Sequence, residues 1–180
     1  MPTTVDPNST GDQLLALGAL LGRSGRVIES EISGSSMGST LPSRCRIRIH
    51  RLALEQYRPG QVIAFIAGGR MFAHRIVYRS RQGVLTRGDT HVWCDLPVPV
   101  CVILGVVAER FLDGKWCPLS EALPFDCQRS TQHRMIETLL RGCMQVDIRL
   151  ADKVWRILMW FARRRRLLFE QICPPGDRTA

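Results

Sequence analysis

The sequence predicts a mainly β protein that ends in a helical extension. Between about Val27 and Glu109, short runs rich in β-branched residues alternate with turn residues, a pattern typical of strands joined by tight turns. From Ser130 to about Gln171 the apolar residues recur instead at helical spacing. Because 180 residues with 45% hydrophobic content suit one compact domain, we expect a β core with additional elements at its ends.

The chain divides into four segments by this reading. An N-terminal segment holds a short helix, because Thr10 and Gln13 stand at the spacing of a capping box and the apolar run Leu14–Leu21 is too short to cross a membrane. The last segment is helical and basic, with a break near Gly142. The expected bounds are 1–24 for the N-terminal segment, 25–110 for the β domain, 111–129 for an irregular connector and 130–180 for the helical extension.

Six strands are expected in the β domain. Gly68-Gly69, between two apolar runs, predicts a two-residue hairpin turn. The strand candidates are Val27–Ile28, the pair Ile47 and Ile49, Gln61–Ile66, Met71–Tyr78, Gly83–Thr86 and Val100–Ala108.

Charge and cysteine usage narrow the classes of function. The formal net charge is +9, and only two of the 25 basic residues, Lys115 and Lys153, are lysine. Such a balance makes a polyanionic surface a plausible partner. The seven cysteines are odd in number and form no CxxC pair, which argues against a disulfide framework or a structural zinc site. We therefore expect a reducing, cytoplasmic location and no metal or organic cofactor.

One stretch is rich in hydroxyl groups. Residues 33–41 read SGSSMGSTL, with four serines and two glycines, a composition that by itself indicates a loop. A serine hydroxyl becomes a useful nucleophile only beside a base, either a desolvated lysine or a histidine held by a carboxylate. Because both lysines lie beyond the β region, histidine is the available base.

Of the four histidines, His74 is the strongest candidate for that base. It interrupts an apolar strand-like run, where an ionisable ring needs a partner or a purpose. His50 lies among arginines in a strand-like run and His133 on the predicted helix, positions typical of surface residues. His91, in a polar turn, remains an alternative.

Five sequence blocks, in order and at compatible spacing, resemble the type I signal peptidase family. The resemblance covers roughly residues 32–108 and implies a signal-peptidase-like β-sheet core. No N-terminal transmembrane anchor of the kind usual in that family is recognised. The blocks are GSSMGSTL (Gly34–Leu41), YRPGQVIAF (Tyr57–Phe65), AHRIV (Ala73–Val77), LTRGDTHVWCD (Leu85–Asp95) and ILGVV (Ile103–Val107).

The resemblance implies a catalytic role for three residues. Ser36, followed by Met37, is similar to the family's nucleophile. His74 stands at the position of the general base, as in the archaeal and endoplasmic-reticulum branch, where the bacterial branch has lysine. Asp95 stands where that branch places its essential acid.

Two further residues are implied as supports. Asp89, in the Arg-Gly-Asp turn, would brace the site, and the choice between Asp89 and Asp95 as the catalytic acid remains open. The backbone N–H of Ser36 would stabilise the oxyanion, and Gly34 would allow the substrate strand to approach closely.

The expected activity is that of a serine endopeptidase which removes a leader or signal-like peptide from a precursor by acyl transfer. Its substrate would be an extended peptide with small side chains one and three positions before the cut. The alternative is a catalytically silent peptide-binding protein on the same fold, with a basic tail that holds membrane or nucleic acid.

The C-terminal segment predicts contact with a membrane surface. Val154–Ala162 is apolar except for Arg156, it contains Trp155 and Trp160, and it precedes Arg163, Arg164, Arg165 and Arg166. Such a helix can lie in the interface of an anionic bilayer, and the tryptophans favour lipid over nucleic acid. The location would then be peripheral, at the inner face of the membrane. The alternative is a helix docked on the β core through Val154, Ile157, Leu158 and Phe161.

Overall fold

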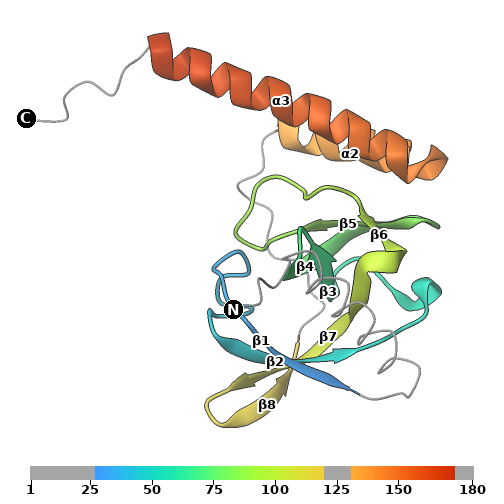
Figure 1. Ribbon diagram of the computed structural model, residues 1–180, viewed down its shortest axis with the longest axis vertical. Helices are drawn as coiled ribbons and strands as arrows, with labels where there is room; N and C mark the ends of the chain where they lie inside the picture. Colours follow the sequence, from blue (N-terminus) through green and yellow to red (C-terminus); the bar gives the residue numbers. More distant parts are fainter. Residues whose placement is uncertain (1–26, 120–130, 173–180) are drawn as a thin grey trace, which may run out of the picture.

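A computed structural model describes residues 27–119 and 131–172, which form one antiparallel sheet of eight strands and two long helices (Figure 1). The predicted mainly β class with a helical C-terminal extension is therefore confirmed. The N-terminal helix expected within residues 1–24 and most of the connector lie outside the described residues. The strands are β1 (Ile28–Ile32), β2 (Cys45–His50), β3 (Val62–Ala67), β4 (Arg70–Arg79), β5 (Gly83–Arg87), β6 (Val98–Pro99), β7 (Ile103–Leu112) and β8 (Lys115–Pro118).

The sheet follows the order β1-β2-β7-β3-β4-β5-β6, and β8 pairs with the far end of β7. Two hairpins close with two-residue turns in which both residues have positive φ, as type I′ turns require. Gly68 and Gly69 join β3 to β4, as predicted. Asp113 and Gly114 join β7 to β8, so our expectation of irregular structure after residue 111 is wrong for this hairpin.

The sheet buries both of its faces. Along β3, Val62, Ala64 and Ile66 belong to one apolar cluster, whereas Ile63 and Phe65 belong to another. Because successive side chains of a strand point to opposite faces, the curved sheet encloses a core on each side of β3. The first cluster also receives Met37 and Leu41, which come from the serine-rich turn.

Two helices follow the sheet, α2 (Thr131–Val146) and α3 (Ile148–Ile172). The break between them lies at Asp147 and not near Gly142, which is inside α2. The Asp147 carboxylate accepts a hydrogen bond from the Arg149 N–H at 2.7 Å, and Gln82 accepts from the Ile148 N–H at 2.7 Å. Asp147 is therefore the N-cap of α3, and a new helix begins after it.

The helices lie side by side over the β4–β5 end of the sheet (Figure 1). Leu140, Met144 and Ala151 form an apolar cluster with Val77 of β4 and Leu85 of β5. Burial of this surface holds the helical pair against the β domain.

Only part of the expected stripe of α3 docks, because Val154 packs against the apolar cluster whereas two other members of the stripe do not. Trp155 packs against the apolar cluster, and its Nε1–H donates to the Cys94 carbonyl at 3.0 Å. Ile157 and Phe161, which the docking alternative placed inward, are each 56% exposed. Trp155, and not these two, therefore faces the β domain.

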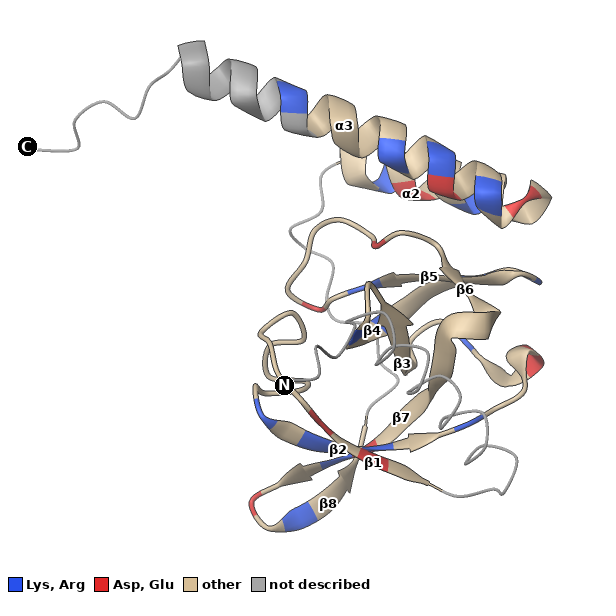
Figure 2. Ribbon diagram, viewed as in Figure 1, with Lys and Arg blue, Asp and Glu red and all other residues tan. Residues whose placement is uncertain are grey.

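Charged side chains lie both at the contact between the helices and the sheet and on the exposed surface of α3. The buried carboxylate of Glu137 on α2 lies between Arg87 of β5 and Arg141. Basic residues are spread along the part of α3 that the structure describes (Figure 2). Among the described residues, no helix has both the length and the apolar character needed to cross a bilayer.

Two methionines on α2 test the docking. Met144 is 1% exposed, whereas Met135 is 67% exposed. Met144→Ala should lower the free energy of unfolding by about 2–5 kcal/mol, because it leaves a cavity between helix and sheet. Met135→Ala, the matched control, should change it by less than about 0.5 kcal/mol. Urea denaturation followed by tryptophan fluorescence measures both, and equal values for the two variants would contradict the docked arrangement.

Candidate active site

The serine-rich stretch forms a tight turn that is anchored in the core on one side of Ser36. Met37 and Leu41 are buried, and the turn is closed by bonds from Gly38 N–H to the Ser35 carbonyl and from Thr40 N–H to the Met37 carbonyl, each 3.0 Å long. These contacts fix the backbone while the Ser36 side chain remains at the surface of a cleft.

Two side chains distant in sequence meet at Ser36. His74 projects from β4, and its Nε2 lies 2.9 Å from Ser36 Oγ. Asp95 follows β5, and its Oδ2 lies 2.6 Å from His74 Nδ1. The structure therefore brings Ser36, His74 and Asp95 together in one hydrogen-bonded series.

The order of donors in this series follows from its chemistry. A carboxylate only accepts hydrogen bonds, so Nδ1 of His74 carries the proton that Asp95 accepts. Nε2 is then left to accept from the Ser36 hydroxyl, which is the arrangement that a general base requires. Asp95 is itself held in place, because Thr86 Oγ1 donates to Oδ2 at 2.8 Å and the Asp95 N–H donates to the Thr86 carbonyl at 2.8 Å.

Asp89 has a different environment. Its carboxylate accepts two bonds from the Arg75 guanidinium, at 2.9 and 2.8 Å, and one from Thr40 Oγ1 at 2.6 Å. Both members of the ion pair are buried. Asp89 therefore joins the serine-rich turn to β4, and Asp95 is the carboxylate that contacts His74.

Backbone groups at Ser36 suit the stabilisation of an anion. Among the described residues the Ser36 N–H has no acceptor, whereas the Ser36 carbonyl accepts from Thr90 N–H at 2.9 Å and from Thr90 Oγ1 at 3.0 Å. Gly34 has φ +130°, and a Cβ there would meet nothing within 4 Å. A backbone N–H of the nucleophile that has no acceptor of its own can donate to an oxyanion.

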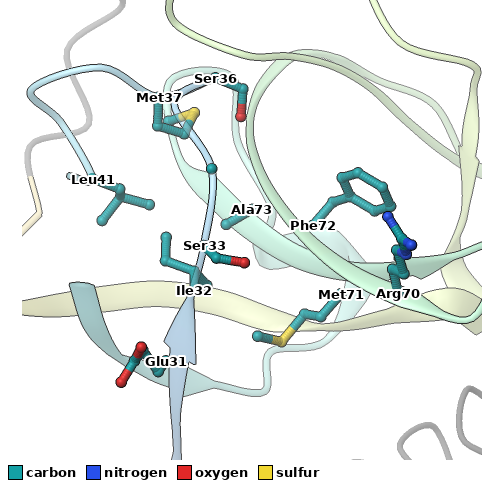
Figure 3. Close-up of a pocket in the computed structure, with 11 residues that line it drawn as sticks. Glu31, Ile32, Ser33, Ser36, Met37, Leu41, Arg70, Met71, Phe72 and Ala73 are labelled. Atoms are coloured by element: carbon teal, nitrogen blue, oxygen red, sulfur yellow. The ribbon is translucent and has the colours of Figure 1, made fainter. Parts of the chain in front are cut away.

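A cleft of about 430 Å³ opens beside Ser36. Figure 3 shows Ser36 and Met37 of the turn at the top of the cleft, Phe72 to the right of them and Ile32 below. Within the described strands, β1 pairs only with β2, and β4 pairs with β5 only from Arg75 onward. The end of β1 and the start of β4 therefore each offer an unpaired edge to the cleft, and an extended chain could add to them as a further strand.

Other chemically reactive groups are not part of this hydrogen-bonded series. Burial raises the pKa of the Cys45 thiol, which keeps it protonated and a poor nucleophile. The His91 ring lies 5.6 Å from that of His74, His133 packs edge-to-face against Trp93, and His50 is exposed on β2. In the described part of the chain, no three histidine, cysteine or acidic side chains are grouped as a metal site would need.

Sequence reasoning missed the residues that bring these segments close. A Cβ at Gly88 would lie 2.7 Å from the Ser36 carbonyl oxygen and 3.1 Å from Ser36 Cβ, so only glycine fits there. Thr90 and Trp155 also hold the site through contacts with residues far away in sequence, and Thr86 does so through Asp95. The Arg-Gly-Asp tripeptide indicates a turn at Gly88, but nothing in the sequence indicates that Ser36 is its neighbour in the fold.

Comparison with known proteins does not add to this picture: no protein-family model, no curated protein and no solved structure matches the chain.

Gly88 provides a test of the site geometry. Gly88→Ala should move the Ser36 turn, and a displacement of about 1 Å at a nucleophile costs on the order of 100-fold in rate. The measurement is the rate at which a fluorophosphonate probe labels Ser36. Gly142→Ala, inside α2 with open space at its Cβ, is the control and should label at the wild-type rate. Unchanged labelling of Gly88→Ala would show that the close approach does not set the position of Ser36.

Proposed function

We propose that the chain is a serine endopeptidase of the signal peptidase type, which cleaves a leader or signal-like peptide from a precursor. The observation that carries the proposal is the hydrogen-bonded series from Ser36 Oγ through His74 to Asp95. A hydroxyl, an imidazole and a carboxylate that are hydrogen-bonded in this order form the arrangement that nucleophilic catalysis by a serine requires.

The reaction begins when Ser36 Oγ attacks the scissile carbonyl carbon and its proton passes to His74 Nε2. Asp95 stabilises the imidazolium that forms, and the Ser36 N–H donates to the negative oxygen. His74 then gives the proton to the leaving amine as the C–N bond breaks. Water attacks the remaining acyl ester, with His74 again as the base, and the free acid departs.

The substrate of this proposal is an extended peptide in the cleft beside Ser36. The unpaired edges of β1 and β4 supply backbone donors and acceptors for a segment before the cut. The preference for small side chains at the first and third positions before the cut rests on the resemblance to signal peptidases. Cleavage of Ala-x-Ala peptides in preference to Leu-x-Leu peptides would support it.

Substitution of the proposed catalytic residues tests the mechanism. Ser36→Ala and His74→Ala should each lower kcat by about 10⁴-fold or more, and Asp95→Asn should lower it by a similar factor. A fluorophosphonate probe or a penem inhibitor should label wild type but not Ser36→Ala. Cleavage of a leader-like peptide, followed by mass spectrometry, gives the rates.

Asp89→Asn is the matched control for Asp95→Asn. It should mainly lower stability, because it weakens a buried ion pair with Arg75. Full activity of Asp95→Asn together with inactivity of folded Asp89→Asn would reverse the assignment of the acid. A wild-type protein that binds peptides but neither cleaves them nor reacts with the probe would instead be the silent binding protein.

We further propose that α3 attaches the protein to anionic membrane surfaces. Ile157, Trp160 and Phe161 are all more than half exposed and share one helix face with Arg164, whose guanidinium lies 5.1 Å from the Trp160 ring. Such a face can bury apolar rings among headgroups while arginines meet lipid phosphate, at about 1 kcal/mol for each basic residue. Trp155, whose indole N–H donates a hydrogen bond to the Cys94 carbonyl, is not part of this surface.

Vesicle sedimentation tests the attachment with the full chain. Wild type should pellet with phosphatidylglycerol-containing vesicles and stay in solution with neutral ones. The double variant Ile157→Ser/Phe161→Ser should stay in solution with both, because it loses the apolar contact without disturbing the docked face. Val27→Ser, at another exposed apolar position on the β domain, should pellet as wild type does. Equal sedimentation of all three proteins would remove the membrane proposal.

A further inference from the structure

A second, larger cavity lies on the other side of His74. Its volume is about 890 Å³, and it is walled by the end of β3, by the segment from Thr90 to Val102 and by α3. It borders His74 and Asp95 but not Ser36, whereas the cleft described above borders Ser36 but neither of the other two. Phe72 lines both cavities and so lies between them.

The walls of this cavity are mainly apolar. Aromatic rings stand around the His74 imidazole, with centroid distances of 6.0 Å to Phe65 and 6.1 Å to Phe72. Val92 and Phe72 are both 39% exposed, and Trp155 closes the cavity on the helical side. Charged groups lie at the α3 rim, where Arg156 pairs with Asp152 at 2.9 Å. Exposed apolar walls with a polar rim are typical of a binding site.

The chemistry proposed for Ser36 and His74 gives the two cavities different roles. During acyl transfer the acyl part of the substrate becomes bonded to Ser36 Oγ, so the residues before the cut stay on the serine side. The amine nitrogen receives its proton from His74 Nε2, so the residues after the cut leave past the imidazole. The cavity that touches His74 and not Ser36 therefore lies on the leaving side.

We propose that this second cavity binds the first two residues after the scissile bond and selects apolar or aromatic side chains there. The inference rests on the proposed peptidase function and names a part of its specificity. The helical extension supplies one wall, so α3 takes part in substrate recognition although it lies outside the region that resembles signal peptidases.

The first experiment measures binding without cleavage. Leu-Phe-amide and Gly-Ser-amide, which mimic the leaving segment with its free amine, are titrated into the full-length protein by calorimetry. Leu-Phe-amide should bind at least about tenfold more tightly, since burial of only two methylene groups changes affinity by that factor. Val92→Glu should remove the difference, whereas Val27→Glu, at an equally exposed valine outside the cavity, should retain it. Equal binding of the two amides to wild type would overturn the inference.

The second experiment measures cleavage of two peptides that are identical before the cut and carry Leu-Phe or Gly-Ser after it. The ratio of kcat/KM should favour Leu-Phe by at least about tenfold in wild type and in Val27→Glu, and should approach one in Val92→Glu. Cleavage of both peptides at equal rates would overturn the inference while the peptidase function stands. Tight binding of Leu-Phe-amide without any cleavage or probe labelling would instead contradict the peptidase and leave an apolar peptide site.

A second variant guards against loss of folding in Val92→Glu. If the melting temperature of that variant falls, Ala67→Trp replaces it. Ala67 is exposed at the end of β3 and lines the same cavity, so a larger side chain there should narrow the cavity and weaken Leu-Phe-amide binding by a similar factor. Wild-type binding in Ala67→Trp would also overturn the inference.

Discussion

The buried carboxylate of Asp89 is the constraint on which the site depends. A charge removed from water must be surrounded by donors, and Asp89 finds them in the Arg75 guanidinium and the Thr40 hydroxyl. Arg75 is the neighbour of His74 on β4, and Thr40 lies four residues after Ser36. The hydrogen bonds that Asp89 accepts therefore fix the two segments that carry the Ser36 hydroxyl and the His74 imidazole. Asp89 therefore acts on the site through position, while Asp95 contacts the ring.

Much of this arrangement could be predicted from local sequence, and the reasons differ from element to element. Gly68-Gly69 gave a correct hairpin because two adjacent glycines readily adopt the positive φ of a type I′ turn. Asp113-Gly114 carries a signal of the same kind, but the prolines and acidic residues that follow drew the prediction toward irregular structure. Likewise Asp147, a good cap, starts α3, although Gly142 was expected to break the helix.

The site residues show where local reasoning ends. Residue chemistry singles out His74, whereas Ser36 and Asp95 are implied only by the resemblance, and the structure places all three within hydrogen-bonding distance. The need for glycine at position 88 could not be predicted, because it arises from the close approach of the Ser36 carbonyl, which is distant in sequence. Trp155 was expected to meet lipid, since nothing in its own sequence neighbourhood reveals the Cys94 carbonyl that it contacts.

The use of arginine where other proteins often have lysine has a consequence for the chemistry around Ser36. Arg110 binds the carbonyl groups of Ser39 and Thr40, and Arg75 binds Asp89, so guanidinium groups hold the nucleophile turn. The two lysines lie elsewhere, Lys115 on β8 and Lys153 on an exposed position of α3. A guanidinium group stays protonated even where it is buried, whereas a buried lysine can lose its proton and become a base. The two guanidinium groups that hold the turn therefore keep their charge across the physiological pH range, and neither can act as a competing base beside Ser36.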